Sequence, residues 1–142
     1  MPAIVQVLGG RKALARDPTS VREWVEQIRA GLPVASAFAL KNALRLNNEE
    51  LAALLGVSAR TVARWNPGKS KLDLVSGDRL VRAARLVAIA AEVLEDNEAA
   101  VHWLRSPQRG LDGAIPLEIA ATDVGARAIE ALLGRMEHGV YT

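Results

Sequence analysis

Apolar residues recur every three or four positions along most of the chain, which is the spacing of an α-helix with one buried face. A first helix is predicted over residues 20–31, where Ser20 and Glu23 have the spacing of a capping box. Its apolar stripe consists of Val21, Trp24, Val25 and Ile28. We therefore expect this helix to pack against a core along that stripe.

Three shorter helices are predicted next along the chain. Pro33 suits the first turn of one that continues to about Leu44, and Asn47 can cap a second. Ser58 can cap a third, which ends near Trp65. The inward-facing positions of the first two would be Val34, Ala37, Phe38, Leu51, Leu54 and Leu55.

A long helix is predicted from about Gly77 to Glu95, opened by Ser76, and Asn97 would cap the helix that follows. The inward face of the long helix would carry Leu80, Ala84, Val87, Ala91 and Leu94. After these two helices, the glycines and prolines of residues 106–116 indicate a turn-rich connection.

The last predicted helix begins at Thr122 and Asp123 and ends at Gly139. Its core-facing positions would be Val124, Ile129, Leu132, Leu133 and Met136. No segment competes as a strand, so the predicted fold class is all-α, with N-terminal helices and a helix-turn-helix bundle joined by a long helix to a small helical C-terminal domain. The expected parts are an N-terminal helical segment (1–32), a helix-turn-helix domain (33–75), and the linking helix with the C-terminal domain (76–142).

Charge is unevenly distributed although the net charge is only +2. Residues 41–86 carry nine Lys or Arg against four acids, and residues 87–142 carry four Arg against nine acids. This asymmetry indicates two surfaces with different partners, the basic one suited to phosphates, unless it is chance variation on solvated helix faces. Without cysteine, a secretory signal or a long apolar stretch, the chain is expected to be soluble and cytoplasmic, with no membrane segment.

Residues 51–65 have the pattern of a DNA-reading helix pair. Ala52, Gly56 and Val62 have the usual spacing of a small residue at the helix contact, a turn residue that tolerates positive φ, and an apolar anchor. Trp65 is expected to fill the core rather than to stack on a base. The residues predicted to contact DNA are Ser58, Arg60, Thr61, Arg64, Lys69 and Lys71.

One such unit contacts few base pairs, so we expect a homodimer that reads paired half-sites of operator DNA. The helix around Trp24 and the long helix from Gly77 are both candidate dimer surfaces, although each can equally be ordinary core. His102 and His138 lie far apart in the sequence, without a metal-binding or catalytic pattern around them. We therefore expect no enzyme activity, no metal and no cofactor.

The final third of the chain resembles the C-terminal toxin-binding domain of Xre/MbcA/ParS-type antitoxins, the partners of RES-domain toxins. The shared features are Trp103-Leu104 with Pro107, Leu111 with Gly113 and Pro116, Thr122 with Gly125, and the ending Leu133-Gly134-Arg135 and Glu137-His138-Gly139. Departures occur at Asp112, where glycine is expected, and at Ala120 and Ala121, where a bulkier apolar residue is expected nearby.

The resemblance implies an antitoxin that docks over the active site of a toxin similar to ADP-ribosyltransferases, which consumes or transfers from NAD. The residues that match the obstructing terminal motif are Arg135, Glu137, His138, Gly139, Val140 and Tyr141. Those that match positions holding the domain's shape are Trp103, Leu104, Pro107, Gly113, Pro116 and Thr122. Two alternatives stay open: a stand-alone dimeric regulator whose C-terminal domain serves dimerisation, and a pure inhibitor whose helix pair is structural.

Overall fold

The computed structural model describes residues 2–10, 13–14 and 18–139. Over these residues the regular structure is helical, and the β-type pairing is confined to an isolated antiparallel bridge between Pro33 and Lys71. The predicted all-α fold class is confirmed. The helices are α1 (Pro2–Val7), α2 (Val21–Ala30), α3 (Val34–Leu44), α4 (Asn48–Leu55), α5 (Ala59–Arg64), α6 (Leu74–Leu94), α7 (Asn97–Leu104), the 3₁₀ turn η2 (Arg109–Leu111), α8 (Pro116–Ile119) and α9 (Asp123–Glu137).

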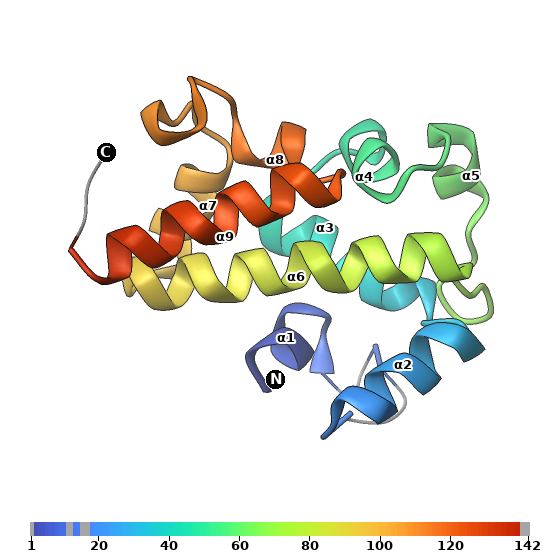
Figure 1. Cartoon of the computed structure of the whole chain (residues 1–142). Coiled ribbons are helices and arrows are strands. Elements are labelled where there is room, and N and C mark those ends of the chain that lie inside the picture. The colour runs from blue at the N-terminus through green and yellow to red at the C-terminus, as the bar shows by residue number, and fades with distance from the viewer. Residues whose placement is uncertain (1, 11–12, 15–17, 140–142) are drawn as a thin grey trace.

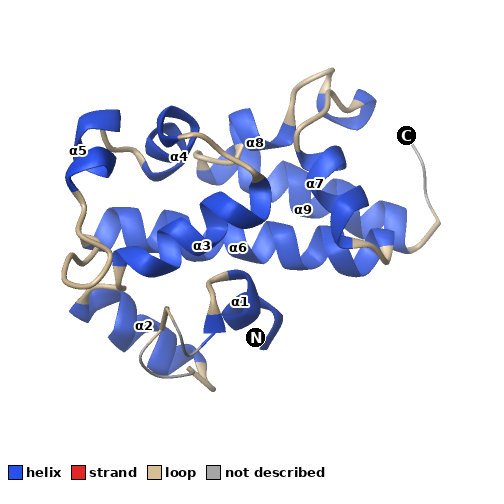
Figure 2. Ribbon diagram, turned by 180° about the vertical axis from the view of Figure 1, so that it is seen from behind, coloured by secondary structure: helices blue, strands red, loops and turns tan. Residues whose placement is uncertain are grey.

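The long helix α6 is the centre of the molecule and packs against α1, α2, α3, α4, α7 and α9. More than one face of α6 is covered by other helices. The buried positions on it include Leu80, Ala84, Leu86 and Ala90. Helix α9 runs beside α6 in the same direction (Figure 1), and α3 crosses in front of α6 in the view from behind (Figure 2). In both views α5 lies at one end of the molecule and the C-terminal end of α9 at the other.

One continuous apolar cluster joins all parts of the chain. At the N-terminus, α1 packs against α6, with Ile4, Val5 and Leu8 buried. Most of the fully buried side chains are leucines. Such side chains fill the space between closely packed helices while staying in favourable rotamers. The boundaries predicted for the three parts stay predictions.

Most helix starts follow from local hydrogen bonding. Asn47 and Glu50 form a complete capping box, because the Asn47 side chain accepts from the Glu50 N–H and the Glu50 carboxylate accepts from the Asn47 N–H. Ser58 and Thr122 cap α5 and α9 as predicted. Ser20 also caps α2, by accepting from the N–H three residues later.

Two predicted helix starts are wrong in detail. Helix α6 begins earlier than expected because the Asp73 carboxylate accepts from the N–H of Ser76 and caps the helix. Ser76 is instead buried within the first turns, with its hydroxyl directed at the Leu55 carbonyl. Helix α7 is capped by Asp96, and Asn97 is its first helical residue. In both cases an aspartate just upstream provides the stronger, charged acceptor.

Three positions predicted to face the core are exposed. Val21, Val25 and Val124 are 69%, 40% and 80% exposed, because no other described segment covers those sides of α2 and α9. The remaining core prediction for α9 holds, with Ile129 and Leu133 completely buried. Among the described helices, none combines the length and the apolar content needed to cross a bilayer.

Candidate functional site

Helices α4 and α5 form the predicted helix-turn-helix. Gly56 ends α4 with a φ of +76°, a left-handed conformation that glycine adopts without strain. Ala52 and Val62 are 2% and 1% exposed, which places the small residue and the apolar anchor in the contact between the two helices. The spacing of these three residues therefore correctly predicted the geometry of the turn.

A cation from α6 lies over this turn, which the sequence analysis missed. A Cβ atom at Gly56 would lie 2.3 Å from a guanidinium nitrogen of Arg79, so the guanidinium rests directly on the turn, and the positive φ is what favours glycine there. Arg79 is separated from the turn by more than twenty residues, and no local pattern links the two. Its position adds one positive charge beside the basic residues of the helix-turn-helix.

The predicted DNA-contacting residues are accessible. Arg60, Arg64, Lys69 and Lys71 are exposed, and none forms an ion pair with another described residue. The hydroxyl of Ser58 accepts from the Thr61 N–H at 3.0 Å and lies 2.9 Å from the Thr61 hydroxyl, so both side chains are engaged at the start of α5. The cations are therefore free to pair with an external anion, while their role in DNA binding stays a prediction.

Trp65 packs inward, as predicted. Its ring meets that of Phe38 edge to face, with the centroids 6.2 Å apart and the planes at 82°. This geometry is favourable for two aromatic quadrupoles, and it holds the residue that follows α5 against α3. The tryptophan thus positions the end of α5 and leaves base contact to the polar residues.

We refer to α7, η2, α8 and α9 as the C-terminal unit. This unit is organised around a polar loop between α7 and α8. The side chain of Gln108 donates to the carbonyls of Trp103 and Ser106 at 2.9 and 3.2 Å. Its backbone N–H donates to Ala114, and its carbonyl accepts from Gly113. Gln108 therefore closes the loop on itself. The sequence analysis missed this role because the partners of Gln108 are backbone groups.

The residues predicted to hold the shape of this unit have different environments. Leu104 and Pro116 are buried, Trp103 is half-buried, Thr122 caps α9, and Pro107 and Gly113 are exposed. Asp112 adopts a left-handed φ of +57°, which aspartate tolerates better than most residues. Ala120 is 3% exposed, and Ala121 is half-buried beside a cavity.

The end of α9 is a protruding polar segment. Glu137, His138 and Gly139 are exposed, and Gly139 turns the chain with a φ of +75°. Arg135 is half-buried, and its Nε atom is buried without a hydrogen-bond partner among the described residues. The two last predicted toxin-binding residues, Val140 and Tyr141, lie outside the described residues.

Two arginines connect the end of α3 and the start of α4 to the C-terminal unit. Arg105, at the end of α7, donates to the Leu44 carbonyl at 3.3 Å and to the Glu50 carboxylate at 3.0 Å. Arg45 donates to Glu98 at 2.6 Å, and the hydrogen bond and charge of that carboxylate raise the pKa of Arg45 above its ordinary value. Both links join the end of one helix to the first turn of another.

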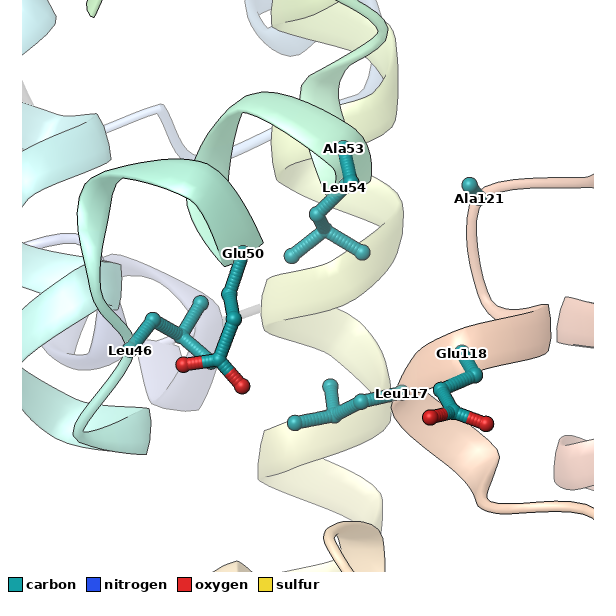
Figure 3. Close-up of a pocket in the computed structure, with 7 residues that line it drawn as sticks. All are labelled: Leu46, Glu50, Ala53, Leu54, Leu117, Glu118 and Ala121. Carbon is teal, nitrogen blue, oxygen red and sulfur yellow. The ribbon is translucent and has the colours of Figure 1, made fainter. Parts of the chain in front are cut away.

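A small cavity of about 250 Å³ lies close to these links, between α4 and α8 (Figure 3). Leu46, Leu54 and Leu117 give it an apolar lining, and the carboxylates of Glu50 and Glu118 approach from opposite sides. Within the described residues, no group of three or more His, Asp or Glu side chains is placed to hold a metal ion. We interpret the cavity as part of the packing between the two units.

Two family models match this chain in consecutive segments. Residues 23–85 match the antitoxin Xre-like helix-turn-helix domain, and residues 90–139 match the antitoxin Xre/MbcA/ParS C-terminal toxin-binding domain. The first segment contains the helix-turn-helix geometry and its exposed cations. The second contains the polar loop and the protruding end of α9.

Curated relatives and a solved structure agree with these matches. The mycobacterial cidal antitoxin MbcA of Mycobacterium tuberculosis is 33% identical over 98 residues, which cover 69% of this chain and 85% of that protein. Antitoxin Xre of Photorhabdus laumondii is 28% identical over 116 residues, covering 81% of this chain and 78% of that protein. A chain in the crystal structure of the M. tuberculosis MbcT–MbcA toxin–antitoxin complex superposes with a TM-score of 0.56 at 27% identity, covering 75% of this chain and 94% of that one.

Proposed function

Because the chain belongs to the antitoxin family defined by the Xre/MbcA/ParS toxin-binding domain, we propose that it neutralises a RES-type toxin by docking the end of α9 over the toxin's active site. The toxin would be an NAD-consuming or ADP-ribosyltransferase-like enzyme. The observation that best supports this proposal is the exposed segment Glu137, His138 and Gly139. It lies at the end of α9, a helix that packs against the core through its buried residues. A rigid helix ending in an exposed polar segment is suited to enter a concave site without a large ordering cost.

The toxin proposal is tested by co-expression with the product of the adjacent gene. A chain that ends at Glu137 keeps the whole of α9 and removes only the five residues beyond it. We expect the full chain to co-purify with the toxin and abolish its activity, and the shortened chain to inhibit much more weakly. Unchanged inhibition by the shortened chain would show that the obstructing segment lies elsewhere.

We also propose that the helix-turn-helix binds operator DNA and represses the chain's own operon, with two copies on paired half-sites. Four exposed cations that form no ion pair with another described residue support this proposal: Arg60, Arg64, Lys69 and Lys71. Since α5 has only six residues, its two arginines provide most of the reach toward base edges, and the lysines beyond the helix are placed for phosphates.

The DNA proposal is tested by titrating a labelled promoter fragment at several salt concentrations. Arg60→Ala and Arg64→Ala should each weaken binding by about 1–3 kcal/mol, and each lost phosphate contact should reduce the log–log salt slope by about 0.9. Arg109→Ala, which removes an exposed arginine from the C-terminal unit, is the matched control and should leave binding unchanged.

The two assays together separate the alternatives. Promoter binding without any captured toxin would favour a stand-alone regulator whose C-terminal unit serves dimerisation. Toxin inhibition without salt-dependent DNA binding would favour a pure inhibitor in which the helix-turn-helix is structural. Loss of inhibition in the shortened chain with intact promoter binding would support both parts of the proposal.

A further inference from the structure

The turn that follows α5 is closed by hydrogen bonds to Asn66. The Asn66 carbonyl accepts from the N–H groups of Lys69 and Ser70 at 3.0 and 2.8 Å. The Asn66 side chain accepts from the Gly68 N–H at 3.0 Å, and the Asn66 N–H donates to the Ser70 hydroxyl at 2.9 Å. These bonds fix the backbone that carries Lys69 and Lys71 before any partner binds, which lowers the ordering cost of binding.

A short antiparallel pairing fastens this turn to the end of α2. Pro33 and Lys71 face each other in the isolated bridge, and beside it the Leu72 N–H donates to the backbone carbonyl of Leu32 at 2.8 Å. A Cβ atom at Gly31 would lie 3.2 Å from the Lys71 Cβ atom and 3.4 Å from its Cδ atom. The aliphatic stem of Lys71 therefore lies along the residue at which α2 ends.

The last turn of α2 carries a further exposed cation, Arg29. It forms no ion pair with another described residue. Arg29 precedes Gly31 by two residues, and Gly31 is the position along which the Lys71 stem lies. Positive charge from two separate segments thus meets where the end of α2 contacts the turn after α5. We refer to Arg29, Lys69 and Lys71 together as the basic corner.

The basic corner lies at the end of the molecule that carries α5. In Figure 1 the C-terminal end of α2 and the turn between α5 and α6 lie next to each other below α5, and Figure 2 shows all three again at one end. Arg60 and Arg64 on α5 are also exposed, so cations extend from α5 through the turn to α2. DNA carries one negative charge per about 1.7 Å of its axis. A duplex that contacts α5 therefore presents further phosphates to the residues beside it.

We propose that Arg29 binds the phosphate backbone of DNA together with Lys69 and Lys71, so that α2 contributes a contact beside the helix-turn-helix. This inference rests on the proposed function and deepens its DNA-binding part, because it adds a contact from a helix outside the helix pair. The ligand is the backbone rather than the base edges, since the basic corner lies beyond the end of α5. A phosphate contact carries no sequence information, so it strengthens binding to every duplex by the same factor.

The first test measures binding of the full chain to two labelled duplexes, the promoter fragment and one of unrelated sequence, over a range of salt concentrations. Loss of one phosphate contact per bound copy makes the log–log salt slope less negative by about 0.9, a difference that grows to about 8-fold in affinity between 1 M and 0.1 M salt. Arg29→Ala should show this loss on both duplexes. Arg29→Lys keeps the charge and should bind nearly as tightly as wild type.

Arg22→Ala is the matched control on the same helix. Arg22 lies in the first turn of α2, away from the basic corner, and is paired with Glu26 at 3.3 Å. Its removal should leave the salt slope unchanged on both duplexes. Equal slopes for Arg29→Ala and Arg22→Ala overturn the proposal.

Thermal unfolding of the same variants separates a DNA contact from a structural role. The C-terminal end of a helix carries a partial negative charge, which an arginine in the last turn also stabilises. If Arg29→Ala lowers the Tm but binds DNA with the wild-type salt slope, Arg29 only stabilises α2 and the proposal is wrong. A reduced slope with a Tm close to that of wild type supports it.

A second test locates the duplex without weakening its binding. The chain contains no cysteine, so Ala30→Cys provides a single thiol at the exposed last position of α2, and His138→Cys provides one just beyond α9, at the opposite end of the molecule. Saturating duplex should slow the reaction of an uncharged maleimide at position 30 several-fold and leave the rate at position 138 unchanged. Equal rates at position 30 with and without duplex overturn the proposal.

These outcomes are distinguishable from failure of the proposed function. If Arg60→Ala and Arg64→Ala weaken promoter binding but Arg29→Ala does not, only this inference fails. If wild type binds both duplexes equally and Arg29→Ala weakens both, the operator proposal fails and the phosphate contact stands. If wild type binds neither duplex at low salt, DNA binding and this inference fail together, and the toxin assay alone decides the remaining part of the proposed function.

Discussion

Gly125 and Gly134 lie on the same helix, α9, and the structure predicts opposite effects for the same substitution at the two positions. A Cβ atom at Gly125 would lie 1.8 Å from the carbonyl oxygen of Ile119 and 2.7 Å from its carbonyl carbon. Both atoms belong to the backbone at the end of α8, so they cannot move aside by a rotamer change. At Gly134 no described atom outside the surrounding backbone of α9 and the two neighbouring residues lies within 4 Å of the added carbon.

The magnitudes follow from two opposing effects. At an unobstructed helix position, alanine is more stable than glycine by about 0.5–1 kcal/mol because glycine loses more backbone entropy on folding. Forcing an extra carbon into a filled site typically costs about 1–3 kcal/mol, and the backbone contact at Gly125 places it at the upper end or beyond. Gly125→Ala should therefore lower the free energy of unfolding by about 2 kcal/mol or more, whereas Gly134→Ala should raise it by about 0.5–1 kcal/mol.

Thermal unfolding followed by circular dichroism compares the two variants directly. For a chain of this length 1 kcal/mol corresponds to roughly 3–4 °C, so Gly125→Ala should lower the Tm by roughly 6 °C or more and Gly134→Ala should raise it by about 2–4 °C. Shifts in the same direction would refute the reasoning, as would a Gly125→Ala variant as stable as wild type. The pair also controls for helix propensity, because only the surroundings of the glycine differ.

Three further substitutions test the fold at other points, each by the same unfolding measurement. Asn47→Ala removes one side of the α4 capping box and should cost about 1 kcal/mol, with Asn48→Ala, one position beyond the cap, as the neutral control. Leu133→Ala empties a completely buried site and should cost about 2–5 kcal/mol; a loss below 1 kcal/mol would mean that α9 is not packed as described. Arg45→Ala breaks a largely exposed ion pair and should leave the Tm unchanged at neutral pH; because Glu98 raises the arginine pKa, any contribution of the arginine charge is present at neutral pH and is lost as the pH rises into strong alkali.

The sequence predicted those features of the fold that depend on neighbours within one or two helical turns. The caps at Asn47, Ser58 and Thr122 and the left-handed turn at Gly56 are set by side chain and backbone groups within five residues of each other. Such signals survive in the sequence because the partners have fixed spacing. The helix-turn-helix was predictable for the same reason.

The features that were missed depend on contacts between distant segments. Asp73 and Ser76 are both suitable caps. The aspartate is the stronger acceptor, and Ser76 is also buried against α4, a tertiary contact that the local sequence does not encode. Arg79 reaches a turn more than twenty residues away, and Gln108 bonds to backbone carbonyls that have no residue-specific signature. In each case the deciding partner is fixed by tertiary packing, which periodicity and spacing do not encode.

The errors at Val21, Val25 and Val124 have a different origin. Periodicity correctly showed that α2 and α9 each have an apolar stripe, since Trp24 and Ile129 on those helices are buried. What periodicity does not encode is whether the same chain or another one covers the stripe. The prediction that Val21, Val25 and Val124 face the core is therefore wrong, because the packing of α2 and α9 leaves these sides of the two helices uncovered by any other described segment.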